Sequence, residues 1–306
     1  MALTVVHHPG YTIDLPANHP FPMEKFRVLR QLLGEQTLAC PIEWHTPQPA
    51  TLESLQRVHT RDYVHAFVHD QLDRAAQRRS GFVWSEALVE RVRLETGGTL
   101  LTLEAALATG LACNSAGGTH HAHADAASGY CLINDLAVAA AHALAQGWAE
   151  RVLIVDCDVH QGDGTARLFE KVPGVFTLSM HAARNFPARK AKSDLDIALP
   201  NGMGDAAYLA ELTSWLPGVL AAYQPDVVLY DAGGRCASRR PPGLFIAKQR
   251  RAVCPRSLRV EPLSRGGHSR RGGDWRWLRP RYHRSRRTPR PATPSRCGCA
   301  GGSSTL

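Results

Sequence analysis

The sequence lacks several features that would place it in a membrane or outside the cell. No stretch of about 18 apolar residues occurs among its 306 residues, so we expect no membrane-spanning helix. Its first residues, MALTVVHHPG, do not have the charged and then apolar order of a signal peptide. The eight cysteines follow no regular spacing, which argues against a disulfide framework. We therefore expect free thiols, a cytoplasmic location and no membrane partner.

Acidic residues are scarce in the last part of the chain. From residue 235 onward there are 18 Arg and one Lys but only Glu261 and Asp274, a net charge of +17, whereas residues 1–234 carry −8. Residues 235–306 also show no helix or strand periodicity. We therefore expect two parts, a globular domain over 1–234 and a disordered Arg/Pro-rich basic tail over 235–306. Such a tail would bind nucleic acid only nonspecifically, through its charge.

The segment around which the globular part is organised is RVLIVDCDVHQGDGT, residues 151–165. Its short apolar, β-branched start predicts a strand buried on both faces of a parallel sheet. Asp156, Asp158 and His160 then alternate, so in an extended chain they project from one side. Acids at a strand end can simply cap the next helix. Three acids, including Asp163, and one histidine within eight residues would instead repel one another without a cation, so the segment predicts a divalent-metal site.

Hydrophobic periodicity predicts the elements that surround this segment. We expect a short strand over residues 3–7 and helical stretches over 23–33, 50–67, 85–109 and 136–146. A glycine pair at 117–118 predicts a loop, and the adjacent His120 and His121 follow it directly. Paired histidines are usually inert on a surface. Here they lead straight into the metal segment, which favours a catalytic role.

Two long motifs carry a resemblance to a known family. GGTHHAHADAASGYCLIND (117–135) and VDCDVHQGDGT (155–165) closely resemble the zinc-dependent histone deacetylase family, which includes bacterial histone deacetylase-like amidohydrolases and acetylpolyamine amidohydrolases. HPFPMEKF (19–26) and HTRDY (59–63) are similar to the family as well, and the resemblance covers about residues 1–233. It implies the arginase-deacetylase fold, an α/β structure with a parallel β-sheet sandwiched by helices. The C-terminal part of that fold would be lost or disordered in this chain.

The resemblance also implies a reaction, the hydrolysis of N-acyl groups from lysine side chains of proteins or from acetylated polyamines. It assigns a role to ten residues: His120 and His121 as a catalytic pair, Asp156 and Asp163 as the acids that orient them, Asp158 and His160 as two of three zinc ligands, Gly129 and Tyr130 as the wall of the acyl-lysine tunnel, and Ser179 and Met180 as part of a possible K⁺ site.

This chemistry needs residues of these types. An amide carbonyl is a poor electrophile, so a Lewis acid must polarise it and activate water near neutral pH. A histidine can take the proton from water and later protonate the leaving amine, and a carboxylate fixes which ring nitrogen carries the proton. A further donor must stabilise the oxyanion. In the family this donor is a tyrosine after a glycine run.

The resemblance ends abruptly after Asp231-Ala232-Gly233. The family carries its third zinc ligand as an aspartate two residues further on, where this chain has Arg235, and the glycine–tyrosine motif is absent from the tail. Two protein ligands hold zinc weakly, and one missing oxyanion donor costs about 100- to 1000-fold in turnover. We therefore expect this chain to be inactive or impaired as written.

Three explanations of the tail remain open: a natural basic tail, an inserted linker, and the same gene read in a shifted frame. Reading from the second base of each codon turns Trp275 and Trp277 into Gly and allows Tyr at Leu278. In that frame residues 267–282 permit GIPVAAVIGGGYDRD and residues 234–243 permit VDAHRDDRLG. One frame thus permits both missing motifs, so we favour a frameshift near codon 234. The alternative functions are a nucleic-acid-binding protein acting through its basic tail and a catalytically inert pseudoenzyme.

Overall fold

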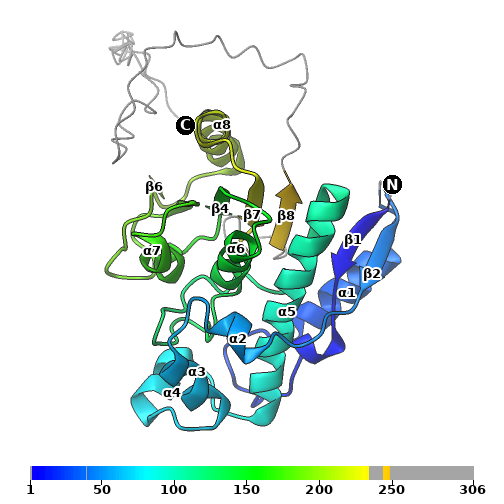
Figure 1. The fold of residues 1–306 in the computed structure, drawn as a ribbon, viewed down its shortest axis with the longest axis vertical. Helices are drawn as coiled ribbons and strands as arrows, with labels where there is room; N and C mark the ends of the chain where they lie inside the picture. The colour runs from blue at the N-terminus through cyan, green and yellow to red at the C-terminus, as the bar shows by residue number, and fades with distance from the viewer. Residues whose placement is uncertain (1, 39, 234–243, 249–306) are drawn as a thin grey trace, which may run out of the picture. The chain divides into compact units, whose positions relative to one another are not determined.

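One eight-stranded sheet forms the centre of the described structure, a computed structural model (Figure 1). The structure describes residues 2–38 and 40–233, together with the backbone of 244–248. The strand order is β2-β1-β3-β8-β7-β4-β5-β6. The strands are β1 (Leu3–Val6), β2 (Ile42–His45), β3 (Leu111–Asn114), β4 (Val152–Asp156), β5 (Val175–Ala182), β6 (Leu195–Leu199), β7 (Val227–Asp231) and β8 (Leu244–Lys248).

All pairings among β1 to β7 are parallel, as the α/β expectation requires. β8 is the exception, because it runs antiparallel to both β3 and β7. The expectation that no strand follows residue 235 is therefore wrong for Leu244–Lys248. These residues, LFIAK, are mostly apolar, and a strand between β3 and β7 gives backbone hydrogen bonds to two edges that would otherwise lack a partner. The rest of 235–306 lies outside the described residues, so its disorder and the boundary at 234 stay predictions.

Helices pack against this sheet, which confirms the layered architecture expected from the sequence. The long α5 contacts β1, β3 and β8, whereas α6 contacts β4 and α7 contacts β5. None of the helices in the described residues has the length and apolarity needed to cross a bilayer. The helices are η1 (Pro9–Tyr11, a 3₁₀ turn), α1 (Lys25–Glu35), α2 (Leu52–Leu55), α3 (Arg61–Val68), α4 (Arg74–Ser80), α5 (Glu86–Thr109), α6 (Asp135–Ala145), α7 (Asp163–Phe169) and α8 (Asp205–Tyr223).

The core beneath the site is built where α6 lies on β4. All five residues of β4 are buried, as expected for a strand covered on both faces. On α6 the buried positions are mostly alanines, which let the helix approach the sheet closely. Asn134 fixes the start of α6, since its side chain accepts a hydrogen bond from the Ala137 N–H at 3.0 Å. This packing holds the carboxyl end of β4 against the loop that carries the paired histidines.

Candidate active site and metal centre

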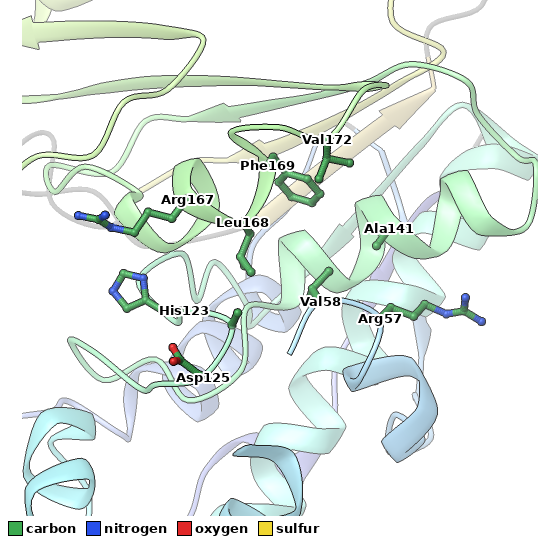
Figure 2. Close-up of a pocket in the computed structure, with 10 residues that line it drawn as sticks. Arg57, Val58, His123, Asp125, Ala141, Arg167, Leu168, Phe169 and Val172 are labelled. Carbon is green, nitrogen blue, oxygen red and sulfur yellow. The ribbon is translucent and has the colours of Figure 1, made fainter. Parts of the chain in front are cut away.

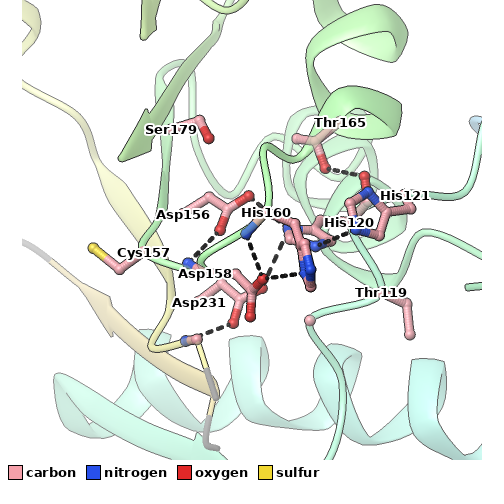
Figure 3. Close-up of polar contacts among 12 residues, drawn as sticks. Thr119, His120, His121, Asp156, Cys157, Asp158, His160, Thr165, Ser179 and Asp231 are labelled. Atoms are coloured by element: carbon pink, nitrogen blue, oxygen red, sulfur yellow. Dashed lines mark hydrogen bonds and ion pairs between the residues drawn. The ribbon is translucent and has the colours of Figure 1, made fainter. Parts of the chain in front are cut away.

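Two histidine–aspartate pairs form the buried centre of the site. The Nδ1 atom of His120 lies 2.6 Å from Asp156 Oδ2, and the Nδ1 atom of His121 lies 2.8 Å from Asp163 Oδ1. The two Nε2 atoms approach each other to 3.1 Å (Figure 3). All four side chains are buried. The structure thus brings together the four residues expected to be catalytic, with each carboxylate holding one imidazole and both Nε2 atoms directed to a common point.

The pKa values of the two histidines are shifted in opposite directions. Burial alone would lower the pKa of His120, but the charge of Asp156 and its hydrogen bond outweigh burial and raise the pKa to about 10. For His121, burial and then the charge of His120 lower the pKa to about 4. At neutral pH His120 therefore holds two protons and donates through Nε2. His121 keeps an unprotonated Nε2 and donates only through Nδ1, to Asp163.

The expected metal ligands Asp158 and His160 lie in a tight turn after β4. β4 ends at Asp156, whose Oδ1 accepts the Asp158 N–H at 2.9 Å, and Asp158 Oδ1 in turn accepts the His160 N–H at 2.9 Å. The extended alternation predicted for this segment is therefore wrong, because the strand ends at Asp156 and these side-chain bonds accompany a bend over residues 158–160. The turn still brings the His160 Nδ1 and Asp158 Oδ1 atoms within 2.9 Å of each other.

The pKa of Asp158 is lowered below its usual range. Burial alone would raise it, but the hydrogen bonds and charge of His160 and the charge of His120 outweigh burial. Asp158 therefore remains a carboxylate, the form that a cation requires.

Asp231, at the end of β7, is a site residue that the sequence analysis missed. Its Oδ2 atom lies 3.9 Å from His120 Nδ1, and the side-chain ligand atoms of His120, Asp156 and Asp231 all lie within 4.8 Å of one another. Burial and then the charge of Asp156 raise the pKa of Asp231 well above its ordinary value. The signals in the sequence were an acid at the carboxyl end of a second strand and the motif Asp231-Ala232-Gly233, in which the family resemblance gave Asp231 no role. Their use depended on knowing that β7 lies beside β4.

The oxygen and nitrogen donors of this region fit a zinc ion, which binds carboxylate and imidazole groups. Space is also reserved beside Asp231, since a Cβ atom on Gly118 would lie 2.7 Å from Asp231 Oδ2 and 2.9 Å from Oδ1. Gly118 has φ +75°, a conformation that favours glycine. The loop before the histidines is therefore shaped around this carboxylate.

A pocket connects these groups to solvent. Gly129 and Tyr130 line it, as expected, together with Asp158, His160 and Asp231. Phe186 lines the pocket as well. The Phe186 ring stands perpendicular to the His121 ring, with centroids 4.8 Å apart. The paired histidines thus share the pocket with the aromatic rings of Tyr130 and Phe186.

Ser179 and Met180 lie in β5, beside β4, and are buried. The Ser179 Oγ and His181 Nδ1 atoms are 3.0 Å apart. Neither residue lines the pocket that contains Asp158. The monovalent-cation site expected there stays a prediction.

A second pocket is lined by residues of α6, α7 and the segment after the paired histidines (Figure 2). It is lined by Arg57, His123, Arg167, Phe169 and other residues, and Figure 2 shows the two arginines directed away from each other. Its link to the site is His123, whose Nε2 atom lies 3.4 Å from Asp163 Oδ2. Because the guanidinium groups of Arg57 and Arg167 point in different directions, they do not form a common binding site for a ligand.

His59, in the HTRDY motif, has a structural role behind the site. Its ring joins two loops, because Nδ1 donates to the His123 carbonyl at 2.8 Å and Nε2 accepts the Asn134 N–H at 2.9 Å. Only the neutral ring can make both bonds, since a backbone N–H needs an acceptor. Burial accordingly lowers the pKa of His59 to about 4.

We expect His59 to make the fold acid-sensitive. Because the pKa of His59 is lower in the folded state than in the unfolded state, its neutral ring stabilises the folded state fully when the pH is above 6.5, the pKa of an unfolded-state histidine. This contribution to stability is lost as the pH falls from 6.5 toward 4. The shift corresponds to about 3 kcal/mol in the free energy of unfolding. Denaturant unfolding at several pH values should show that His59→Gln removes this part of the pH dependence. His65→Gln, at an exposed position of α3, should keep the wild-type slope; equal slopes for all three proteins would contradict the assignment.

Comparisons with known proteins found a matching family model and several relatives. The family model described as "Histone deacetylase domain" matches residues 19–241. An uncharacterized protein of Picosynechococcus sp. is 48% identical over 233 residues, covering 76% of this chain and 78% of its own length. Histone deacetylase 8 of Arabidopsis thaliana is 27% identical, covering 78% and 68%. The crystal structure of a histone deacetylase homolog from Aquifex aeolicus is similar with a TM-score of 0.62 and 26% identity, over 75% of this chain and 67% of that one.

Proposed function

This chain belongs to the histone deacetylase family, and from that premise we propose that it is a zinc-dependent amidohydrolase acting on acylated lysine side chains. The observation that carries the proposal is the pair of buried imidazoles, each held by its own carboxylate, with both Nε2 atoms directed to one point beside Asp158 and His160. Asp158 and His160 would hold the zinc ion. When bound, zinc would supply Lewis-acid polarisation of the amide carbonyl and a nucleophile near neutral pH.

The two histidines would have different tasks in the reaction. His121 has the unprotonated Nε2, so it would accept the proton of the attacking water and later pass it to the leaving amine when the C–N bond breaks. His120 has a proton on Nε2 and stays charged because of Asp156, so it would donate a hydrogen bond to the developing negative charge. Asp163 keeps the His121 proton on Nδ1, which leaves Nε2 free for its task.

The rim of the pocket favours a protein substrate over a polyamine. Arg78 and Arg79 of α4 are exposed and line the entrance. An acetylated polyamine keeps other cationic nitrogens, which these guanidinium groups would repel, whereas an acyl-lysine can lie in an acidic peptide. Gly129, Tyr130 and Phe186 would enclose the methylene chain of the lysine. We keep a cytoplasmic location and a K⁺ ion near Ser179 and Met180 as parts of this proposal.

We also propose that residues 235–306 are encoded in a shifted reading frame. The support is the codon arithmetic, which permits both missing motifs in one frame. The nucleic-acid-binding alternative rests on residues outside the described part of the chain, and a fragment of residues 235–306 that ignores DNA at low salt would remove it. The nucleotide sequence around codon 234 tests the frameshift directly.

The proposed reaction is tested by residual activity at high enzyme concentration. The purified chain is expected to release acetate slowly from an acetyl-lysine peptide, and to stop when zinc is removed by a chelator and resume when zinc is returned. His121→Ala should lower the residual rate about 100-fold or more, because it removes the general base. His65→Ala, at an exposed position, serves as the control and should leave the rate unchanged. Hydrolysis that persists without zinc or without His121 would contradict the proposal.

A further inference from the structure

We propose that Asp231 is the third protein ligand of the metal site in this chain, together with Asp158 and His160. This inference rests on the proposed zinc-dependent function. It concerns the position left open by Arg235, where the family resemblance expects a carboxylate and this chain has a cation. A carboxylate from β7 would complete the three protein ligands that a catalytic zinc site uses.

The position of Asp231 is fixed by the sheet. β7 and β4 are parallel neighbours, and their register pairs Asp231 with Asp156. Paired residues of adjacent strands project to the same face, so the two side chains leave the sheet together. The backbone is held as well, because the Cys157 N–H donates to the Asp231 carbonyl at 3.0 Å. That bond ties Asp231 to the turn that carries Asp158 and His160.

The carboxylate of Asp231 is buried and has little to balance its charge. The residue is 7% exposed, and its Oδ1 accepts the Gly233 N–H at 3.2 Å. Among the described residues, Oδ2 accepts no hydrogen bond, and its ion pair with His120 Nδ1 is long, at 3.9 Å. That nitrogen is already bonded to Asp156 at 2.6 Å. A buried carboxylate beside two others is costly unless a cation lies between them.

The remaining donors identify where that cation would lie. Asp158, His160 and Asp231 line the pocket together with His120 and His121. Those two histidines are each held by a carboxylate of their own, Asp156 and Asp163. Figure 3 shows the Asp158 and Asp231 carboxylates near each other beside the His160 and His120 rings. Gly118 leaves Asp231 the room to turn toward the ion, since a side chain there would collide with both of its oxygens.

The test measures metal binding by the full-length chain, independently of activity. Zinc affinity is determined by competition with a chromophoric chelator after the chain has been stripped of metal. Asp231→Asn keeps the shape of the side chain and removes its charge, and it should lower zinc affinity about 10- to 100-fold or more. Asp226→Asn is the matched control, because it makes the same change just before the opposite end of β7 and should leave affinity unchanged.

Charge alone can weaken binding, so a second measurement reports coordination. Cobalt(II) bound to the wild-type chain should give visible absorption bands characteristic of its ligand set, and Asp231→Asn should change their intensity and position. Asp163→Asn removes a nearby buried charge that is not a proposed ligand, and it should leave the bands in place. Far-ultraviolet circular dichroism and thermal unfolding verify that each variant is folded before its affinity is compared.

Three other outcomes of these measurements would each contradict a different part of the proposal. If Asp231→Asn binds zinc and cobalt like the wild type while Asp158→Asn loses both, Asp231 is not a ligand and the proposed function stands. If His160→Ala keeps full zinc affinity while Asp156→Asn and Asp231→Asn lose it, the ion lies with His120 and the proposed ligand set is wrong. If the wild-type chain binds no zinc at micromolar concentration, the ligand proposal and zinc dependence in this chain both fail.

Discussion

This 306-residue chain is expected to turn over an acetyl-lysine peptide about 100- to 1000-fold more slowly than the same gene product with its reading frame restored after codon 234. The reason is the absent oxyanion donor, because the sequence has no tyrosine after a glycine run in its tail. His120 can donate one hydrogen bond to the developing charge, but the second donor is missing. A third metal ligand from Asp231 would restore zinc binding without restoring this donor.

The measurement is kcat for the two proteins, both loaded with zinc and compared at equal metal content. A third protein separates the causes: the frame-restored chain in which the tyrosine of its glycine run is replaced by phenylalanine. Its rate should fall most of the way to that of the present chain, because the tyrosine hydroxyl is the oxyanion donor. Equal rates for the present and the frame-restored chains would contradict both the frameshift and the assignment of the missing groups.

Replacing Gly164 by alanine is expected to destabilise the fold by about 3 kcal/mol or more, at the upper end of the cost of overpacking. A Cβ atom on Gly164 would lie 2.3 Å from the Ala122 carbonyl oxygen and 2.7 Å from the His120 carbonyl oxygen. Both are backbone atoms, which cannot move aside as a flexible side chain can. The same contact holds the histidine loop against α7, since the Thr165 N–H donates to the His120 carbonyl at 3.0 Å. The substitution should therefore also separate His121 from Asp163.

The free energy of unfolding in urea measures this effect. Gly204→Ala is the matched control, because Gly204 also lies at the start of a helix and no atom lies within 4 Å of the Cβ that it would gain. It should change stability by less than about 1 kcal/mol. If the Gly164→Ala protein were as stable as the Gly204→Ala protein, the loop that carries His120 and His121 could move away from α7 without loss of stability. That result would weaken the claim that close packing positions the histidines.

Much of the site could be predicted from the sequence because its signals are local. The apolar run before Asp156 identified β4, and the two long motifs identified the family and the histidine pairs. The helices expected over 23–33 and 85–109 are α1 (Lys25–Glu35) and α5 (Glu86–Thr109), with ends displaced by one or two residues. Periodicity and motif spacing are properties of neighbouring residues, so they are present in the chain before it folds.

Other features arise only from contacts between distant segments. The turn at Asp158 and His160 is made by side-chain hydrogen bonds that an alternating pattern does not reveal. The strand β8 forms because β3 and β7 both offer it a partner, although its own segment is short and lies among arginines.

The clearest case is Asp231, which is 75 residues from Asp156 in the sequence and pairs with it across two adjacent strands. In the sequence it belonged to the motif Asp231-Ala232-Gly233, after which the family resemblance expects the third zinc ligand, but it had no role of its own. The order of the strands and their register bring its carboxylate to His120 and Asp158, and both are decided by how the whole sheet buries its apolar residues. The sequence by itself thus determined which chemical groups the site contains, whereas the tertiary structure decided which carboxylates share it.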